Sequence, residues 1–408
     1  MAEWPLTLDV DGLRAAGWRP TPFRQFILKI HSRCDLACTY CYVYKMADSG
    51  WQGRPKTMSP QIADATVNRI AEHVDAHRLP EIEVILHGGE PLLAGPGVIR
   101  RIVTGVRSAV GDRTRVAATL QTNGVLLDSR YLELFGELEV RVGVSLDGDE
   151  EAHDRNRRRA DGRGSHRHVV EALRLLTRPE FRRVFGGLLC TIDLGNDPIR
   201  VYEALLEFDP PAIDFLLPHG NWTTPPPGRD PDGDATPYAD WLITIFDRWY
   251  HADHDVPRVR LFEEILHLLL GGASATELVG LSPAAMIVVE TDGAIEQSDL
   301  LKSVYDGAAA TGLHVLRDSF DDALRLPAIA ARQLGRAALA GRCRACPISA
   351  VCGGGLYVHR YRAGSGFANP SVYCPDLFRL ITHIRSRVAA DLAAAARDRS
   401  PRSADEPA

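Results

Sequence analysis

The chain has 408 residues, and its 47 lysines and arginines against 53 aspartates and glutamates give a formal net charge of −6. Hydrophobic residues make up 45% and charged residues 25% of the sequence, which excludes collagenous, coiled-coil and largely disordered chains. The charge balance argues against a nucleic acid partner. No apolar run approaches the roughly 18 residues of a membrane span, and the N-terminus lacks a signal-peptide pattern. We therefore expect a cytoplasmic protein with reduced cysteines and no membrane partner.

Between about residues 23 and 270, short β-rich runs alternate with stretches of helical periodicity. Six runs are predicted as strands: 23–30, 82–87, 116–122, 140–146, 184–192 and 213–217. Ser59 and Asp197, each followed by proline, are typical N-caps for helices over 62–74 and 201–208. Strands that are each followed by a helix imply a parallel sheet. Six units fall short of a closed eight-unit barrel, so we predict an α/β fold with a partial (β/α)6 TIM barrel, whose site lies at the carboxyl ends of the strands.

The rest of the chain divides by composition. The expected organisation is an N-terminal segment 1–22, the barrel 23–235, a helical linker 236–279, a cysteine-rich extension 280–396 and a disordered tail 397–408. Helices are expected at 238–251, 259–270 and 376–396, and a long Pro/Gly-rich loop at 218–237. Loops of that length are usually functional or disordered.

The eight cysteines fall into groups of three, one and four. The first group, with the spacing C-x3-C-x2-C, follows the first predicted strand and consists of Cys34, Cys38 and Cys41. Three thiolates are one too few for a closed [4Fe–4S] site, so the pattern predicts a cluster with one iron open to a chelating ligand. A zinc site or buried thiols are the alternatives. The single Cys190 lies within a predicted strand and is interpreted as a small buried hydrophobe.

Glycine and polar side chains follow the next three predicted strands. The segments are His87-Gly88-Gly89-Glu90-Pro91, Gln121-Thr122-Asn123-Gly124 and Ser145-Leu146-Asp147-Gly148. Each alone indicates no more than a turn. Because the carboxyl ends of parallel strands meet at one rim, the three segments together predict a ligand site there.

These motifs resemble those of the radical S-adenosylmethionine (radical SAM) family over about residues 23–220. The resemblance implies that the first three cysteines hold a [4Fe–4S] cluster and that SAM chelates its open iron. It also implies hydrogen abstraction by a 5′-deoxyadenosyl radical, with an external electron donor of the flavodoxin or ferredoxin type. The SAM contacts that it implies are Tyr40 near the adenine, the GGEP-motif residues Gly88, Gly89 and Glu90 at the amino group, and Asn123, Ser145, Asp147 and Arg157 at the rim. Arg157 belongs to an arginine-rich segment whose alternative interpretation is a solvated loop.

The second cysteine group consists of Cys343, Cys346, Cys352 and Cys374. Its spacing alone fits structural zinc or a fully ligated iron–sulfur cluster equally well. Beside a radical SAM core it resembles the SPASM extension, which usually carries two auxiliary clusters and seven cysteines. Three of those thiol positions are occupied here by Ser282, Ser298 and Leu356. We therefore expect one auxiliary cluster, and two [4Fe–4S] clusters in all.

Asp299 is the candidate catalytic residue, because it matches an aspartate that some SPASM enzymes use as a base. A turn or capping residue is the alternative. The segments 31–38, 42–48 and 352–376 resemble FxsB-type SPASM peptide maturases. That resemblance implies a ribosomally made precursor peptide in which an aromatic ring is joined to a Cβ atom, forming a three-residue cyclophane.

Two further classes of function stay open from the sequence. One is another radical SAM peptide modification: a thioether, an epimerised residue or an oxidised side chain. The other is a non-catalytic metal-binding protein. About 22 residues precede the first predicted strand, so we expect peptide recognition to use the barrel mouth, the loop 218–237, the helices up to residue 270 or a separate protein.

Overall fold

The computed structural model describes residues 3–230, 233–252 and 256–398. Its core is one ten-stranded sheet with the order β10-β9-β8-β1-β2-β3-β4-β5-β6-β7. The strands are β1 Gln25–His31, β2 Glu81–Gly88, β3 Arg115–Thr122, β4 Val140–Ser145, β5 Phe185–Thr191, β6 Ala212–Leu216, β7 Arg258–Val259, β8 Met286–Val289, β9 Ala294–Glu296 and β10 Ala310–His314.

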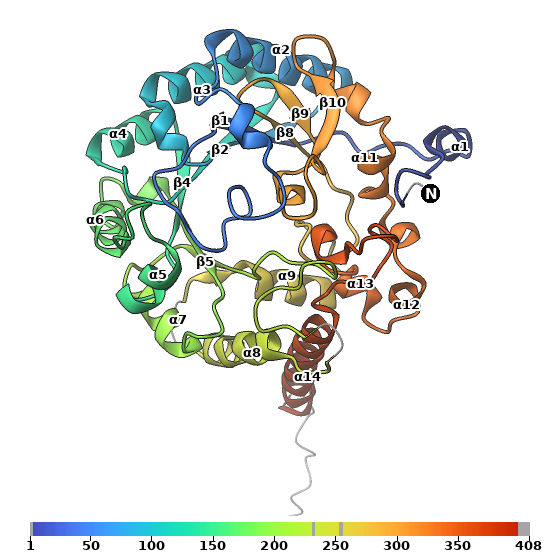
Figure 1. Ribbon diagram of the computed structural model, residues 1–408. Coiled ribbons are helices and arrows are strands. Elements are labelled where there is room, and N and C mark those ends of the chain that lie inside the picture. Colours follow the sequence, from blue (N-terminus) through green and yellow to red (C-terminus); the bar gives the residue numbers. More distant parts are fainter. Residues whose placement is uncertain (1–2, 231–232, 253–255, 399–408) are drawn as a thin grey trace, which may run out of the picture.

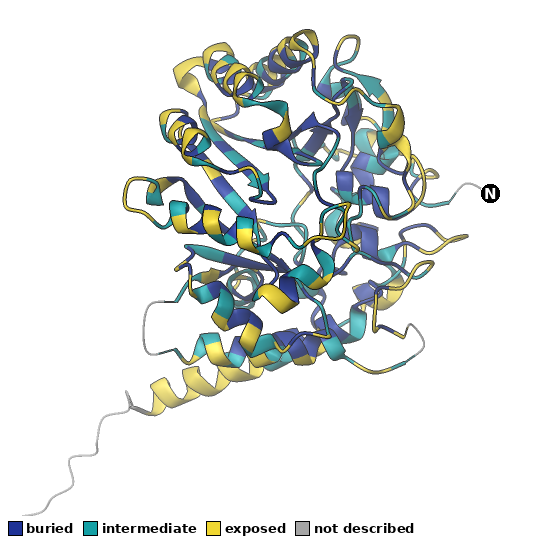
Figure 2. Cartoon of the chain, turned by 60° about the vertical axis from the view of Figure 1, so that its left-hand side comes forward, coloured by how far each residue is buried: buried dark blue, intermediate teal, exposed yellow. Residues whose placement is uncertain are grey.

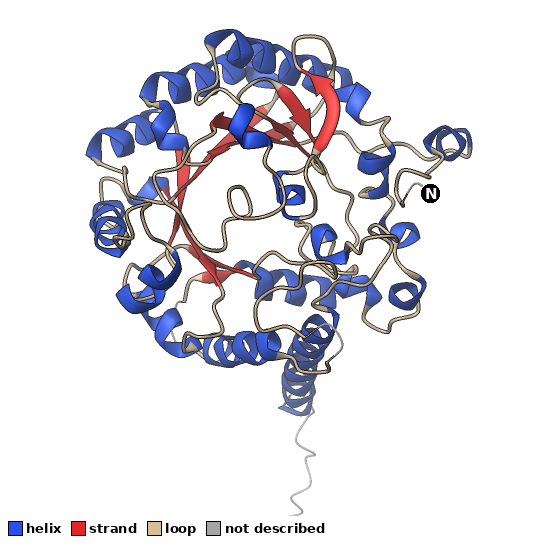
Figure 3. Cartoon of the chain, viewed as in Figure 1, coloured by secondary structure: helices blue, strands red, loops and turns tan. Residues whose placement is uncertain are grey.

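Helices cover the outside of this curved sheet (Figure 1). The helices are α1 Val10–Ala15, α2 Pro60–His77, α3 Pro96–Val110, α4 Ser129–Glu137, α5 Glu150–Asn156, α6 His166–Leu176, α7 Pro198–Leu206, α8 Pro237–Tyr250, α9 Arg260–Leu269, α10 Phe320–Ala323, α11 Pro327–Ala331, α12 Gly341–Arg344, α13 Ser349–Cys352 and α14 Cys374–Asp398. Figure 3 shows the strands as an open ring, with loops crossing its inside.

The predicted α/β partial barrel is confirmed. Strands β1 to β6 correspond to the six predicted runs, and each pairs in parallel with the next. The expected caps are present, because the Ser59 side chain accepts a hydrogen bond from the Ile62 N–H and Asp197 accepts one from the Arg200 N–H. In the described part of the chain, no ladder joins β7 to β10, so the barrel is open.

The sheet continues into the C-terminal extension, which the sequence had indicated to be less regular. Strand β8 pairs in parallel with β1, with Phe26 opposite Ile287, and β9 and β10 add antiparallel pairs. The apolar run at 284–289 has six residues, which is too short for periodicity to separate strand from helix. The division proposed at residue 280 therefore cuts through one hydrogen-bonded sheet.

The core lies between the sheet and its outer helices (Figure 2). Alternate residues of β1, including Phe26 and Leu28, are fully buried against the helices, so the other face of the strand looks into the barrel. Of the expected disordered tail 397–408, Arg397 and Asp398 belong to α14, and residues 399–408 lie outside the described residues. No helix in the described ranges is long and apolar enough to span a membrane.

Phe246 joins three helices that close the lower side of the barrel. It is fully buried on α8 and packs against Phe262 of α9 and His383 of α14. We expect Phe246→Ala to lower the free energy of unfolding by about 3–5 kcal/mol, because the space left by the phenyl ring lies between three helices that cannot close over it. Leu392→Ala, on the exposed part of α14, should change it by less than about 0.5 kcal/mol. Anaerobic urea unfolding measures both, and equal effects would contradict this packing.

Candidate radical SAM site

One cavity of about 730 Å³ lies inside the open barrel. It reaches from the carboxyl ends of the strands, where all three cysteines of the first group line it, down to Arg24 and Gln25 at the start of β1. The thiols of Cys34, Cys38 and Cys41 form no disulfide. Burial raises the pKa of Cys34 and of Cys38, so a bound cation is what would keep these sulfurs ionised. The donor set therefore fits a metal cluster.

The two glycines that follow β2 let this strand approach the cysteine loop closely. The N–H of Gly89 donates to the His31 carbonyl at 2.8 Å, and the N–H of Glu90 donates to the Arg33 carbonyl at 2.9 Å. A Cβ atom on Gly88 would clash with the His31 carbonyl, and one on Gly89 with the Arg33 carbonyl. Both glycines line the cavity as expected for SAM contacts. Their steric role in holding the loop was not foreseen.

Glu90 lies one layer behind the cavity wall. It is 1% exposed, and its carboxylate accepts hydrogen bonds from the Leu92 N–H, the Thr122 hydroxyl and the Asn123 N–H. Burial raises its pKa to about 7. In this conformation Glu90 ties the end of β2 to the end of β3. Its predicted contact with the SAM amino group stays a prediction.

Tyr40, Asp147 and Arg157 form one hydrogen-bonded group, in which Asp147 and Arg157 are buried. The Tyr40 hydroxyl donates to Asp147 Oδ2 at 2.5 Å, and Arg157 Nη1 donates to the Tyr40 oxygen at 2.8 Å. Tyr40 and Arg157 line the cavity, whereas Asp147 supports them from behind. The Nε of Arg157 is buried and has no partner among the described residues, which fits an anionic group such as the SAM carboxylate. Arg157 thus points inward, although Arg163 of the same segment pairs with Asp161 on the surface.

Asn123 and Ser145 complete the predicted rim. Asn123 Nδ2 donates to Asp35 Oδ1 at 2.8 Å and lies 3.6 Å from the Cys34 sulfur. The Ser145 hydroxyl accepts from Gln121 Nε2 at 3.0 Å. Six of the eight predicted SAM contacts therefore line the same cavity as the three cysteines; they are Tyr40, Gly88, Gly89, Asn123, Ser145 and Arg157.

The second cysteine group lies in the C-terminal extension. Burial raises the pKa of Cys343, Cys352 and Cys374, and neighbouring thiols of the same group raise it further. After Cys352, three glycines with positive φ form a tight loop, and Arg360 Nη2 donates to the carbonyls of Gly353 and Gly355 at 2.7 and 2.6 Å. The four thiols and the arginine beside them fit an anionic metal–thiolate group.

A separate group of potential metal ligands lies outside both cysteine groups. Among the described residues, the group of three or more potential ligands gathered within 4.8 Å is His73, His77 and Asp321. The histidine group is itself structural, since His73 Nε2 accepts from the Phe23 N–H while Nδ1 faces Asp321.

The third feature of the cavity is Asp299, at the start of the 3₁₀ helix η5 Asp299–Ser303. Its Oδ2 accepts from Lys29 Nζ at 2.7 Å and from the Tyr42 hydroxyl at 2.6 Å. Burial would raise its pKa, but the Lys29 ammonium and then His87 lower it well below the usual range. The three positions without thiols, Ser282, Ser298 and Leu356, line the cavity on this side.

Sequence reasoning missed Lys29, Tyr42 and the cavity histidine His219, and it placed His87 at the rim without giving it a role. Lys29 is the residue for which a signal existed. It stands between Leu28 and Ile30 in a strand predicted to be buried, where an unpaired lysine is rare. His219 carried no such signal, because it follows a strand as many surface residues do.

Comparison with known proteins agrees with this geometry. Residues 28–200 match the model of the Radical SAM superfamily. A cysteine-type anaerobic sulfatase-maturating enzyme of Clostridium perfringens is 26% identical over 289 residues, which cover 68% of this chain and 74% of that protein. The structure of native anSMEcpe with bound AdoMet superposes with a TM-score of 0.76 at 21% identity, covering 91% and 99% of the two chains. Streptococcus suis SuiB bound to precursor peptide SuiA has a TM-score of 0.58 at 14% identity, covering 89% and 78%.

Residues 28–200 of this chain are therefore a radical SAM domain. The expected cofactors, SAM with one [4Fe–4S] cluster in this domain and one auxiliary cluster, are confirmed at the level of the family. Which residues hold each cofactor stays a prediction, and so does the assignment of the chain to the FxsB-type subgroup.

The two cysteine groups predict the metal content. Anaerobically reconstituted protein should contain about eight irons per chain, four for each cluster. Cys374→Ala should lose about half of them, whereas Cys190→Ala, which alters a buried thiol outside both groups, should keep all. Iron and zinc are measured together by mass spectrometry. About four irons with one zinc would make the second group a zinc site, and about twelve would mean that a third cluster exists.

Gly89→Ala tests the approach of β2 to the cysteine loop. The added methyl group must displace the Arg33 carbonyl or Tyr44, so we expect a lower melting temperature and less iron in the first cluster. Gly97→Ala is the matched control, because nothing lies within 4 Å of its Cβ position on α3, and alanine favours a helix by about 0.5–1 kcal/mol. Normal iron binding by Gly89→Ala would mean that the loop tolerates the shift.

Proposed function

We propose that this protein is a radical SAM enzyme that modifies a side chain of a ribosomally made precursor peptide, joining an aromatic ring to a Cβ atom in a three-residue cyclophane. The observation that carries the proposal is the position of Asp299, a buried carboxylate in the same cavity as the three cysteines. Support for a peptide substrate comes from relatives, since SuiB was solved with the precursor peptide SuiA.

The cavity has room for more than SAM. Its upper end holds the cysteines and the predicted SAM contacts, and its lower end is lined by Asp214, Arg260 and the segment 274–278. We assign the upper end to SAM and the lower end to the peptide.

When bound, SAM and its cluster supply the radical that removes a hydrogen atom from Cβ of the substrate. The protein must then orient the ring, exclude water and accept a proton. Forming the new C–C bond leaves one proton and one electron to be lost from the ring. Asp299 is the proton acceptor in this proposal, because its carboxylate is ionised and lines the cavity. An external one-electron donor of the flavodoxin or ferredoxin type supplies the electron that cleaves SAM, and the electron lost from the ring returns to the oxidised form of this carrier.

Oxidation of a side chain to a carbonyl is the second candidate. It is favoured by the similarity to sulfatase-maturating enzymes, one of which, the serine-type enzyme of Bacteroides thetaiotaomicron, is 21% identical over 89% of this chain. The same carboxylate could accept the proton in that reaction. The two candidates therefore differ in product rather than in site.

Co-expression with a small open reading frame beside the gene separates the candidates. A cyclophane removes two hydrogens, gives no fragment ions between the linked residues in tandem mass spectrometry, and does not react with hydrazide reagents. An oxidised side chain reacts with hydrazide and fragments normally, which would replace the proposal by the second candidate. If reduced enzyme and SAM yield no 5′-deoxyadenosine, both are wrong.

Asp299→Asn tests the proton acceptor. The variant should still produce 5′-deoxyadenosine at a comparable rate but little cross-linked peptide, because the amide cannot accept the proton. Asp306→Asn is a matched control, since Asp306 lies beyond the same 3₁₀ helix and bonds Ser49 at the surface. Liquid chromatography of 5′-deoxyadenosine and peptide from the same reaction gives the ratio. A wild-type ratio for Asp299→Asn would remove Asp299 from the mechanism.

A further inference from the structure

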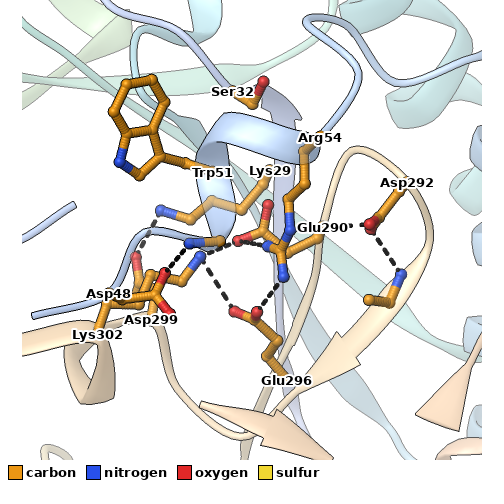
Figure 4. Close-up of polar contacts among 12 residues, drawn as sticks. Lys29, Ser32, Asp48, Trp51, Arg54, Glu290, Asp292, Glu296, Asp299 and Lys302 are labelled. Atoms are coloured by element: carbon orange, nitrogen blue, oxygen red, sulfur yellow. Dashed lines mark hydrogen bonds and ion pairs between the residues drawn. The ribbon is translucent and has the colours of Figure 1, made fainter. Parts of the chain in front are cut away.

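A buried lysine lies beneath the candidate proton acceptor. Lys29 is 2% exposed in the middle of β1, on the face of the strand that looks into the barrel. Its Nζ lies 2.7 Å from Asp299 Oδ2, 3.1 Å from His87 Nδ1 and 3.3 Å from the Gly88 carbonyl (Figure 4 shows the pair with Asp299). An ammonium has three donors, so Lys29 is fully engaged.

The two oxygens of Asp299 have different surroundings. Both hydrogen bonds to the carboxylate, from Lys29 and from Tyr42, end on Oδ2. Oδ1 has no hydrogen-bond partner among the described residues. It is not one of the unpartnered polar atoms that are buried, so it is accessible. Because Asp299 lines the cavity, Oδ1 is the oxygen that a substrate can reach.

Charged and titratable groups face Asp299 from every element packed against it. Lys29 comes from β1, Tyr42 from the cysteine loop, His87 from β2 and His219 from the loop after β6. Glu290, directly after β8, lies close to Lys29 but is itself paired with Arg54 and Lys302 (Figure 4). Burial lowers the pKa of His87 and of His219 to about 4, so both are neutral near pH 7. Lys29 is thus the cation in contact with the carboxylate.

Stability alone does not account for this ion pair. Desolvation of two buried charges offsets most of their attraction, and well-packed apolar replacements are often as stable. The pair does fix both the charge and the orientation of the carboxylate, which is what a proton acceptor requires.

We propose that Lys29 is a positioning residue, which holds Asp299 ionised through Oδ2 and leaves Oδ1 directed at the substrate. The inference rests on the proposed function, in which Asp299 accepts a proton from the peptide. Lys29 itself touches neither SAM nor substrate, and it is not among the residues that line the cavity.

The test compares two buried lysines of the same network. Lys302, also 2% exposed, lies in the same 3₁₀ helix as Asp299, but its ammonium pairs with Glu290 and Glu296 (Figure 4). Lys29→Met should leave Asp299 buried without its cation, which raises its pKa. Both variants should be less stable than the wild type, but Asp299 should stay ionised in Lys302→Met.

The first readout needs no substrate. In reconstituted holoenzyme labelled with [4-¹³C]aspartate, infrared difference spectra should show a protonated carboxyl band at neutral pH for Lys29→Met. That band should be absent from the wild type, from Lys302→Met and from the double variant Lys29→Met/Asp299→Asn. An ionised Asp299 in Lys29→Met would overturn the proposal.

The second readout is the pH profile of modified peptide per 5′-deoxyadenosine, with the co-expressed precursor as substrate. Since the carboxylate must be ionised, Lys29→Met should lose product as the pH falls below the raised pKa, about tenfold for each unit, and regain it at alkaline pH. Lys29→Arg, which keeps the charge, should follow the wild-type profile. Equal profiles for Lys29→Met and Lys302→Met would reduce Lys29 to a structural residue.

Controls separate this inference from the proposed function. If neither the wild type nor any variant modifies the peptide, the proposed function is wrong. The infrared result then still decides whether Lys29 keeps Asp299 ionised. If Lys29→Met does not fold, Lys29→Gln replaces it, because an amide keeps a donor without the charge. A neutral residue at position 29 that leaves Asp299 ionised would overturn the inference in either variant.

Discussion

The parallel pairing of β8 with β1 is the contact on which the candidate site depends. Strand β1 leads into the cysteine loop, and β8 leads through β9 to η5 and Asp299. Strand β1 delivers the cysteines at its carboxyl end, whereas β9 runs antiparallel to β8 and turns the chain back, so that Asp299 meets Lys29 of β1 inside the barrel. Had the extension folded as a separate domain, Asp299 would not face the cavity.

A network of buried charges reinforces that pairing. Arg54, which follows the cysteine loop, contacts Glu290 and Glu296 of the β8–β9 hairpin at 2.6 Å each, and Lys302 pairs with the same two carboxylates. Charges buried this deeply are costly unless paired, so the network tolerates few alternative arrangements. The network therefore fixes the position of the extension on the barrel and adds little net stability.

Close backbone approach is the second constraint on the site. The end of β2 touches the cysteine loop at Gly88 and Gly89, and the glycines after Cys352 allow Arg360 to bind two carbonyls beside the second thiol group. In both places a cysteine segment that lacks regular structure of its own is held by hydrogen bonds to a glycine segment. Metal sites need such fixed ligands, because a mobile loop would lose entropy on every binding event.

The sequence by itself determined the features that depend on neighbouring residues. Cysteines within eight positions of each other, glycines directly after a strand and the alternation of strands with helices predicted the partial barrel, the first ligand group and its rim. Tertiary structure decided which oxygens and nitrogens meet. Lys29 and Asp299 are separated by 270 residues, and Glu90 and Asp147 lie behind the wall they were expected to form. Spacing along the chain cannot encode these contacts, since they follow from the order of strands in the sheet and from the side on which each buried group finds a partner.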